Sequence, residues 1–191
     1  MSVKIIVDST TDLLPSIREQ VTVVPLTVCF GQEEFTDGVT ITHEQFYEKL
    51  VECDVLPTTS QASPAAFSRV LSETLAPGDS ALILTLSSEL SGTYQSAVIA
   101  AGEFEKVFVV DSSSVAIGTG ILTEYALECV KKGMSAKETA EEIERKKKDV
   151  CVIAMLDTLE YLKKGGRISS TAAFAGGILN IKPVVNIEEG R

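Results

Sequence analysis

Several residue types that often carry chemistry are scarce in this sequence of 191 residues, which has no tryptophan and a single histidine. That histidine, His43, lies between Thr42 and Gln45, whose spacing is that of a helix capping box. We therefore expect His43 to be an exposed residue in the first turn of a helix. A serine hydrolase triad would depend on this one histidine, and no GxSxG sequence is present to support it.

The cysteines and the apolar runs also exclude several classes of protein. Cys29, Cys53, Cys129 and Cys151 form no CxxC pair, so we expect neither a zinc site nor a redox motif. Reduced thiols in a cytoplasmic protein are the simplest interpretation. No apolar run approaches the ~18 residues of a membrane-spanning helix, and the amino terminus lacks the pattern of a signal peptide. We expect no membrane span.

Positive charge is in deficit, with 17 Lys and Arg against 27 Asp and Glu and a net charge of −10. Such a surface repels phosphate backbones, which argues against a nucleic-acid partner. The segment GTGILT at 118–123 lacks the third glycine of a dinucleotide-binding loop, and no GxxxxGK[ST] sequence occurs. Asp8, Asp12, Asp37 and Asp111 are scattered, and roles in turns and caps fit them better than a metal site.

What the sequence does have is an alternation of apolar runs with helical segments. Buried strands are predicted over 4–9, 80–86 and 106–112, and one or two more over 21–30. Helices are predicted over 43–52, from 63 to about 77, and over 92–101, 115–132 and 135–148. This alternation predicts an α/β fold with a mostly parallel sheet and flanking helices.

A second unit is predicted to begin near residue 150. A strand over 150–156 precedes a short helix that Asp157 could cap and that the two glycines at 165–166 would end. A small-residue segment, SSTAAFAGGIL, then leads to a strand over 180–187. We therefore expect an α/β lobe over residues 1–149 and the beginning of a second, incomplete lobe over residues 150–191, because so few elements bury little surface.

Four hydroxyl-rich loops, at 8–12, 58–64, 86–96 and 111–120, each follow a strand or open a helix. Ligands of open α/β sheets bind beyond the carboxyl ends of the strands, where hydroxyls and helix N-termini can hold an anion. Any one of these loops could equally serve only as a helix cap. Gly92, directly after Ser91, would let a ligand approach the backbone closely. Arg167 could form two bonds to a carboxylate or phosphate, or a surface ion pair.

An ordered set of motifs runs through essentially the whole chain: DSTTDL, FTDGVTIT, PTTSQASP, LSSELSGTYQSA, VVDSSSVAIGTG, LEYLKKGGRIS and LNIKP. As a set, it closely resembles the DegV family. The resemblance implies two lobes with a long-chain fatty acid bound between them, and a bacterial carrier protein that performs no chemistry and needs no cofactor or metal. It also implies a partner, a dihydroxyacetone-kinase-like fatty acid kinase subunit that phosphorylates the presented carboxylate.

The resemblance also assigns site residues. The carboxylate is expected to meet Thr59 and Ser60 of the TSQ motif, Ser91 of the SGT motif and Arg167 of the GGRIS motif, while Gly92 supplies close backbone approach. Family members continue beyond the NIKP strand, complete the second lobe and add a late histidine to which His43 does not correspond. The sequence is therefore expected to be a truncation or a short variant. The alternative function is an enzyme or sensor that binds a small phosphate or carboxylate ligand in the same crevice.

Overall fold

The structure is a computed structural model that describes residues 2–53, 55–168 and 182–191. Its centre is a parallel four-stranded sheet in the order β2-β1-β6-β7. The strands are β1 (Val3–Asp8), β2 (Thr22–Val24), β6 (Ser80–Thr85) and β7 (Val107–Asp111). Residues 81–86 are buried throughout, as expected for a central strand whose two faces are both covered by helices. The predicted α/β class is confirmed.

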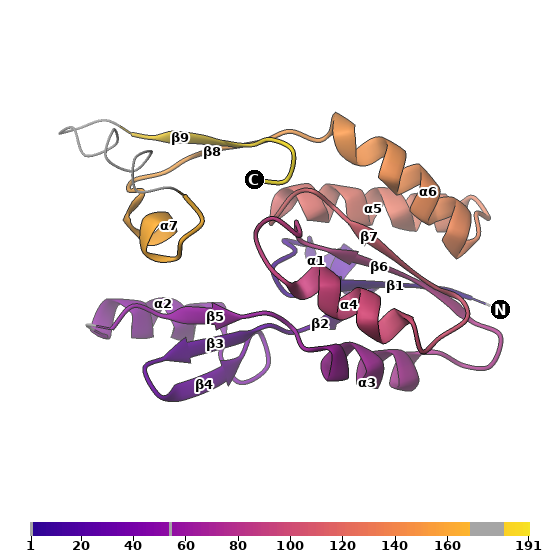
Figure 1. The fold of residues 1–191 in the computed structure, drawn as a ribbon, viewed down its shortest axis with the longest axis horizontal. Coiled ribbons are helices and arrows are strands. Elements are labelled where there is room, and N and C mark those ends of the chain that lie inside the picture. The colour runs from indigo at the N-terminus through magenta and orange to yellow at the C-terminus, as the bar shows by residue number, and fades with distance from the viewer. Residues whose placement is uncertain (1, 54, 169–181) are drawn as a thin grey trace.

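Side chains alternate between two hydrophobic cores, one on each face of this sheet. Leu82 and Leu84 pack with helices α5 (Ile117–Lys131) and α6 (Ala136–Lys146). Ile83 faces the opposite side and packs with α3 (Pro64–Thr74) and α4 (Thr93–Ala101). Figure 1 shows these helix pairs on either side of the sheet. Truncation of a buried leucine at this centre to alanine is expected to cost about 2–5 kcal/mol.

A smaller antiparallel sheet extends from this layered body, in the order β4-β3-β5. It consists of β3 (Thr27–Phe30), β4 (Glu33–Thr36) and β5 (Thr58–Ser60), covered by α2 (His43–Glu52). Phe30, Phe35 and Phe46 form its core with Val28 and Ile41. The strands at 33–36 and 58–60 were not predicted, because both are short and consist mainly of charged or hydroxyl residues.

The carboxyl-terminal part forms a two-stranded antiparallel sheet of β8 (Val152–Met155) and β9 (Val184–Ile187), with α7 (Glu160–Lys164) between them in sequence. Figure 1 shows that it extends on the same side as the small antiparallel sheet. We call these two projecting parts the jaws of the molecule. The prediction that Asp157 caps α7 is wrong. Leu159 is the N-cap, the Thr158 hydroxyl accepts from the Glu160 amide at 3.1 Å, and Asp157 pairs with Lys182 instead. The predicted small-residue segment at 169–179 lies outside the described residues.

Helix ends follow the local sequence signals closely. The capping boxes of Thr42 with Gln45 and of Ser135 with Glu138 are both confirmed, and His43 is exposed as expected. Helix α3 ends at Thr74, earlier than predicted, and α6 ends at Lys146 in a 3-10 turn, η1 (Lys147–Asp149). A short helix, α1 (Pro15–Arg18), was not predicted.

No helix among the described residues is long and apolar enough to cross a membrane.

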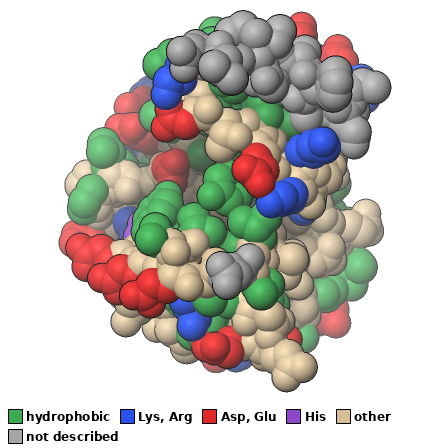
Figure 2. Space-filling view, turned by 90° about the vertical axis from the view of Figure 1, so that its left-hand side faces the viewer, with side chains coloured by type: hydrophobic (Ala, Val, Ile, Leu, Met, Phe, Trp, Pro, Cys, Tyr) green, Lys and Arg blue, Asp and Glu red, His purple; other side chains and the backbone are tan. Residues whose placement is uncertain are grey.

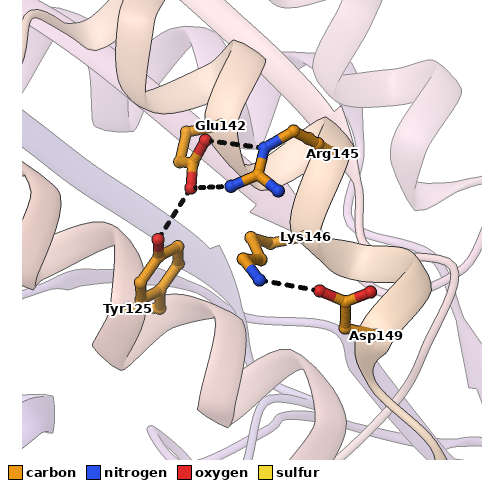
Figure 3. Close-up of polar contacts among 5 residues, drawn as sticks. All are labelled: Tyr125, Glu142, Arg145, Lys146 and Asp149. Atoms are coloured by element: carbon orange, nitrogen blue, oxygen red, sulfur yellow. Dashed lines mark hydrogen bonds and ion pairs between the residues drawn. The ribbon is translucent and has the colours of Figure 1, made fainter.

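Polar contacts tie α5 to α6 at the outer surface of the body (Figure 3). The Tyr125 hydroxyl donates to Glu142 at 2.7 Å, and Arg145 donates to both oxygens of the same carboxylate at 2.6 and 3.1 Å. Lys146 pairs with Asp149 at 2.8 Å. The cationic run at 145–148 is thus partly neutralised by acidic neighbours, which agrees with a solvated helix end rather than a phosphate site.

Candidate functional site

Three of the four hydroxyl-rich loops meet at the carboxyl edge of the parallel sheet. The Ser87 amide donates to the Ser114 carbonyl at 2.8 Å, which joins the loops after β6 and β7. A bridge between Thr11 and Ala116 joins the loop after β1 to the loop after β7. The fourth loop, at 58–64, begins instead as strand β5 of the antiparallel sheet. The four loops therefore belong to two different sheets, whereas the sequence predicted a single sheet edge.

Asp8 holds two of these loops in place from below. Its carboxylate accepts from the Thr10 hydroxyl at 2.6 Å, the Thr10 amide at 3.0 Å and the Leu86 amide at 2.7 Å. Asp8 is fully buried, and burial raises the pKa of its carboxyl group, although these hydrogen bonds act to lower it. Because all of its partners belong to the loops themselves, Asp8 acts as a structural clamp and not as a ligand.

A cavity of about 550 Å³ lies beyond these loops, between the two jaws. Its walls come from the body, from the three-stranded sheet and from the carboxyl-terminal part with β8, α7 and β9. The apolar lining residues are Leu26, Val28, Leu86, Leu90, Val115, Ala116, Val152, Ala154, Leu156, Leu162, Ile168, Val185 and Ile187. Figure 2 views the molecule from the jaw side and shows hydrophobic side chains gathered in the hollow, with charged side chains around it. The cavity is within the ordinary size range of small-molecule sites and is mainly apolar.

Three of the five predicted site residues line this cavity: Thr59, Ser91 and Arg167. They come from β5, from the turn before α4 and from the turn after α7, and so represent all three parts of the molecule. Ser60 and Gly92 are not among the lining residues. Ser60 follows Thr59 on a strand, where successive side chains point to opposite faces. The structure thus brings together three residues that are far apart in the sequence.

Ser91 lies just before the first turn of α4. Its hydroxyl is 2.9 Å from the Thr93 hydroxyl and accepts weakly from the Thr93 amide at 3.3 Å. Ser91 is half-buried, and Gly92 offers no side-chain cap to the helix. The start of α4 therefore combines a hydroxyl donor with amides near the positive end of a helix dipole, which suits an anion.

Arg167 reaches from the turn after α7 to the loop that carries Ser91. Its Nε and Nη2 atoms donate to the Leu90 carbonyl at 3.4 and 3.3 Å, and Nη1 donates to the Gly165 carbonyl at 2.6 Å. The two bonds to Leu90 are long, so they are weak. The guanidinium is exposed and can exchange them for shorter, charge-assisted bonds to an anion beside Ser91.

Gln61 is a site residue that the sequence analysis did not single out. Its side chain donates to the Ser96 hydroxyl at 2.9 Å and occupies the space where a Cβ on Gly92 would lie. Gln61 also lines the cavity. Gly92 therefore has a structural reason to be glycine, since the carboxamide of Gln61 packs against it. The only available signal was the position of Gln61 directly after the Thr59-Ser60 pair.

Charged and amide groups at other points of the cavity were also missed. Asp37, Asn186 and Arg191 line it, together with the phenol ring of Tyr161. Asp37 was expected to serve only in a turn, and Asn186 and Arg191 lie in or after a strand that carries no polar motif. Within the described ranges, no three acidic, histidine or cysteine side chains are grouped so that they could hold a metal ion.

Comparisons with known proteins agree in fold and in sequence. The model of a family described as "Uncharacterised protein, DegV family" matches residues 2–191. A DegV domain-containing protein of Deinococcus radiodurans is 39% identical over 194 residues, which cover 100% of this chain and 69% of that protein.

Solved structures resemble the chain over its whole length. A fatty-acid-binding DegV family protein of Thermus thermophilus has a TM-score of 0.88 and 40% identity, and a stearic acid-binding protein of Eubacterium ventriosum has a TM-score of 0.89 and 28% identity. The match covers 100% of this chain in both cases, and 69% and 68% of those proteins.

A third solved structure is the Fatty Acid Kinase (Fak) B3 protein of Streptococcus pneumoniae loaded with linoleic acid, with a TM-score of 0.86 and 26% identity. The match covers 100% of this chain and 70% of that protein. Since the family model extends over nearly every residue and relatives more than 30% identical match throughout, this chain belongs to the DegV family.

Proposed function

We propose that this chain binds a long-chain fatty acid in the cavity between its two jaws and presents the carboxylate to a partner kinase. In this proposal residues 1–149 form the first lobe and residues 150–191 begin the second. The observation that carries it is the cavity itself, in which aliphatic side chains predominate and polar groups are few. The Thermus, Eubacterium and Streptococcus proteins, whose names or titles state fatty-acid ligands, support the same ligand class.

The composition of the cavity suggests how the binding free energy divides. Each buried CH₂ contributes ~0.8 kcal/mol, so a sixteen-carbon tail gains roughly 10 kcal/mol before the cost of ordering it. A hydrogen bond to a charged group contributes only about 1.5–3 kcal/mol. The apolar wall then supplies most of the affinity, whereas the polar residues determine which end of the ligand faces the partner.

The carboxylate is proposed to lie between Ser91, Thr59 and Arg167. Ser91 would donate its hydroxyl from the start of α4, and Arg167 would replace its long bonds to the Leu90 carbonyl by bonds to the carboxylate. Ser60, whose side chain follows Thr59 on β5 and does not line the cavity, would contribute only through the backbone of that segment. Gly92 would leave room for the ligand at the backbone, in addition to the space that it leaves for Gln61.

We further propose that the chain is a carrier and not an enzyme. The hydroxyl of Ser91 is bonded to Thr93, and among the described residues no histidine or carboxylate forms a hydrogen bond with it that would mark a general base. The name of the Streptococcus relative, which refers to a fatty acid kinase, supports a partner that performs the chemistry. The proposed partner is a dihydroxyacetone-kinase-like subunit that phosphorylates the presented carboxylate.

Native mass spectrometry of the purified chain tests the ligand class directly, since a bound lipid adds its own mass. Delipidated protein would then be titrated with saturated fatty acids of increasing length. We expect the affinity to rise about fourfold per CH₂ until the cavity is full. Methyl esters of the same acids serve as the matched control, and they should bind more weakly because they lack the charged head group.

The same experiment separates the alternative function. A sensor or enzyme for a small phosphate or carboxylate would bind acetate and a long-chain acid with similar affinity, because it would gain nothing from the tail. Such a flat dependence on length would overturn the fatty-acid proposal. The presentation of the carboxylate is tested separately, by adding a kinase subunit of the proposed type with ATP and measuring acyl phosphate.

A further inference from the structure

A second, smaller hollow lies on the outside of the body, between α1 and α5. It has a volume of about 330 Å³ and is lined by Asp12, Leu13, Leu14, Ile17, Ile117, Gly120, Ile121 and Glu124. Three of its apolar side chains are unusually open to solvent: Leu14 is 65% exposed, Ile117 is 59% exposed and Ile121 is 51% exposed. We call these lining residues the α1/α5 groove. Large apolar side chains grouped in this way are typical of an interaction surface.

The apolar side chains belong to one continuous face. Ile117 and Ile121 are one turn apart on α5, and Glu124 follows on the same face. Leu14 approaches this face from the loop before α1, and Gly120 permits the approach because its missing Cβ would meet the Asp12 carbonyl oxygen. The groove is thus formed by close backbone packing in the fold and not by a chance cluster of surface residues.

The rim of the groove carries charge of one sign. Asp12 and Glu124 are both exposed, and neither forms an ion pair within the part of the chain that the structure describes. No lysine or arginine lines the groove. An apolar floor with a negative rim is complementary to a segment that carries large aliphatic or aromatic side chains flanked by Lys or Arg.

Charge also argues against two other occupants. A second copy of this chain has a net charge of −10, so self-association would place like charges together at an acidic rim. A bacterial lipid surface with anionic head groups would meet the same repulsion. A basic partner protein is the occupant that the rim favours.

The α1/α5 groove and the larger cavity are lined by neighbouring residues of the same two loops. Thr10 and Ala116 line the cavity, whereas Asp12 and Ile117, close by on the same two loops, line the groove. The Ala116 carbonyl accepts from the amide of Asp12 at 3.3 Å and from the amide of Gly120 at 3.0 Å. A protein that fills the groove therefore contacts the loops that form one wall of the cavity.

We propose that the α1/α5 groove is a docking site for a partner protein whose contact segment is an amphipathic helix with aliphatic side chains on one face and flanking lysine or arginine. This inference goes beyond the proposed ligand and does not depend on it. The side chains that carry it are Leu14, Ile117 and Ile121 on the floor and Asp12 and Glu124 at the rim.

Fluorescence anisotropy with a labelled helical peptide of leucine and lysine tests the proposal on the intact chain. Ile121→Ser removes part of the floor, and Glu124→Lys reverses the charge of the rim. Each should weaken binding by roughly tenfold, the loss expected for about 1.4 kcal/mol. The effect of Glu124→Lys should shrink when salt is added, because an exposed charge is screened.

Two matched control variants keep the test specific. Ile99→Ser removes an isoleucine that is 54% exposed on α4, and Glu73→Lys reverses an exposed charge on α3, both outside the groove. Both should bind the peptide as the parent chain does, and a peptide with glutamate in place of lysine should not bind. Equal losses in the controls would overturn the proposal. Self-association of the chain that Ile121→Ser abolishes, without peptide binding, would overturn it in favour of a second copy as the occupant.

Discussion

The side chain of Gln61 fills the space beside Gly92 that any larger residue would use for its Cβ. This contact joins the small antiparallel sheet to the start of α4, and the bond from Gln61 to Ser96 at 2.9 Å strengthens the same junction. Thr59 and Ser91 lie close to Gln61 and Gly92 in the sequence. The junction therefore determines the distance between two of the residues that are proposed to bind the carboxylate. A change at Gly92 should therefore act on the site through its geometry.

Gly92→Ala should displace Gln61 and break its bond to Ser96. We expect a loss of about 1 kcal/mol in the free energy of unfolding, the net value of one hydrogen bond, because the displaced carboxamide is the far end of a flexible side chain, together with weaker fatty-acid binding. Chemical denaturation and a fatty-acid titration on the same variant measure both. Gly102→Ala is the control, because its added Cβ would meet nothing closer than 3.4 Å and its φ of −61° suits alanine. Similar losses in both variants would contradict this reading.

Ser91→Ala separates a ligand role from a capping role. As a ligand, the hydroxyl should contribute about 1.5–3 kcal/mol to head-group binding, which corresponds to roughly a tenfold to hundredfold loss of affinity. Transfer of phosphate by the partner kinase should fall further, because a misplaced carboxylate loses its attack geometry. The fold should survive, since the bond to the Thr93 amide is long and a lost cap costs at most about 1–2 kcal/mol.

Ser88→Ala is the matched control for this variant. Ser88 lies on the same loop but donates to Asp111 at 2.6 Å and is not among the residues that line the cavity. Its removal should lower the melting temperature slightly and leave fatty-acid affinity unchanged. If Ser91→Ala behaves in the same way, with a lower melting temperature and unchanged affinity, Ser91 is only part of the helix start.

Local signals predicted most of the elements, because each is determined by residues close together in the sequence. Ser63 with Pro64 marks the start of α3, and the paired Ser135 and Glu138 mark the start of α6. Continuous apolar runs identified β1, β6 and β7. Strand β5 carried no such signal, since Thr58 to Ser60 are all exposed and form a strand only by pairing with β3.

The candidate site likewise contains residues that local motifs predicted and residues that depend on the assembled fold. The motifs predicted Thr59, Ser91 and Arg167 as residues that bind a carboxylate, and all three line one cavity. The aliphatic wall was not predicted residue by residue, because Val28 and Val185 come to line one cavity only after two separate sheets have formed. Gln61 was missed for a similar reason, as its role depends on the empty space at Gly92, which no local pattern reveals.

Cysteine reactivity should follow exposure. Cys129 is buried, and burial raises the pKa of its thiol, whereas Cys151 is exposed. Since the thiolate is the reactive form, we expect iodoacetamide to label Cys151 first and Cys129 last in the native protein. Timed labelling followed by peptide mass spectrometry gives the order. Labelling of Cys129 as fast as Cys151 would show that α5 opens readily, and Cys151→Ser serves as the control that removes the fast site.

The contacts of Glu142 with Tyr125 and Arg145 should make the junction of α5 and α6 sensitive to pH at both ends of the scale (Figure 3). Bonds from Arg145 and then from Tyr125 lower the pKa of Glu142. The bond to Glu142 is the main cause that raises the pKa of Tyr125 to about 12. The ionised Glu142 carboxylate therefore stabilises the fold above the ordinary pKa of a glutamate. This contribution is lost as pH falls through the lowered pKa. The protonated Tyr125 hydroxyl stabilises the fold below the ordinary pKa of a tyrosine. This contribution is lost as pH rises through about 12.

The variant Tyr125→Phe tests both the acid and the alkaline prediction. The free energy of unfolding of the variant should be lower than that of the parent chain by a constant amount near neutral pH, and the difference should vanish in acid as Glu142 is protonated. After a rapid jump to alkaline pH, the ultraviolet signal of phenolate formation in the parent chain should include a step at about 12 that the variant lacks. Tyr47→Phe is the control, because Tyr47 is 64% exposed on α2, and it should retain that step. Loss of the step in the Tyr47 variant, or its persistence in the Tyr125 variant, would assign the high pKa to another tyrosine.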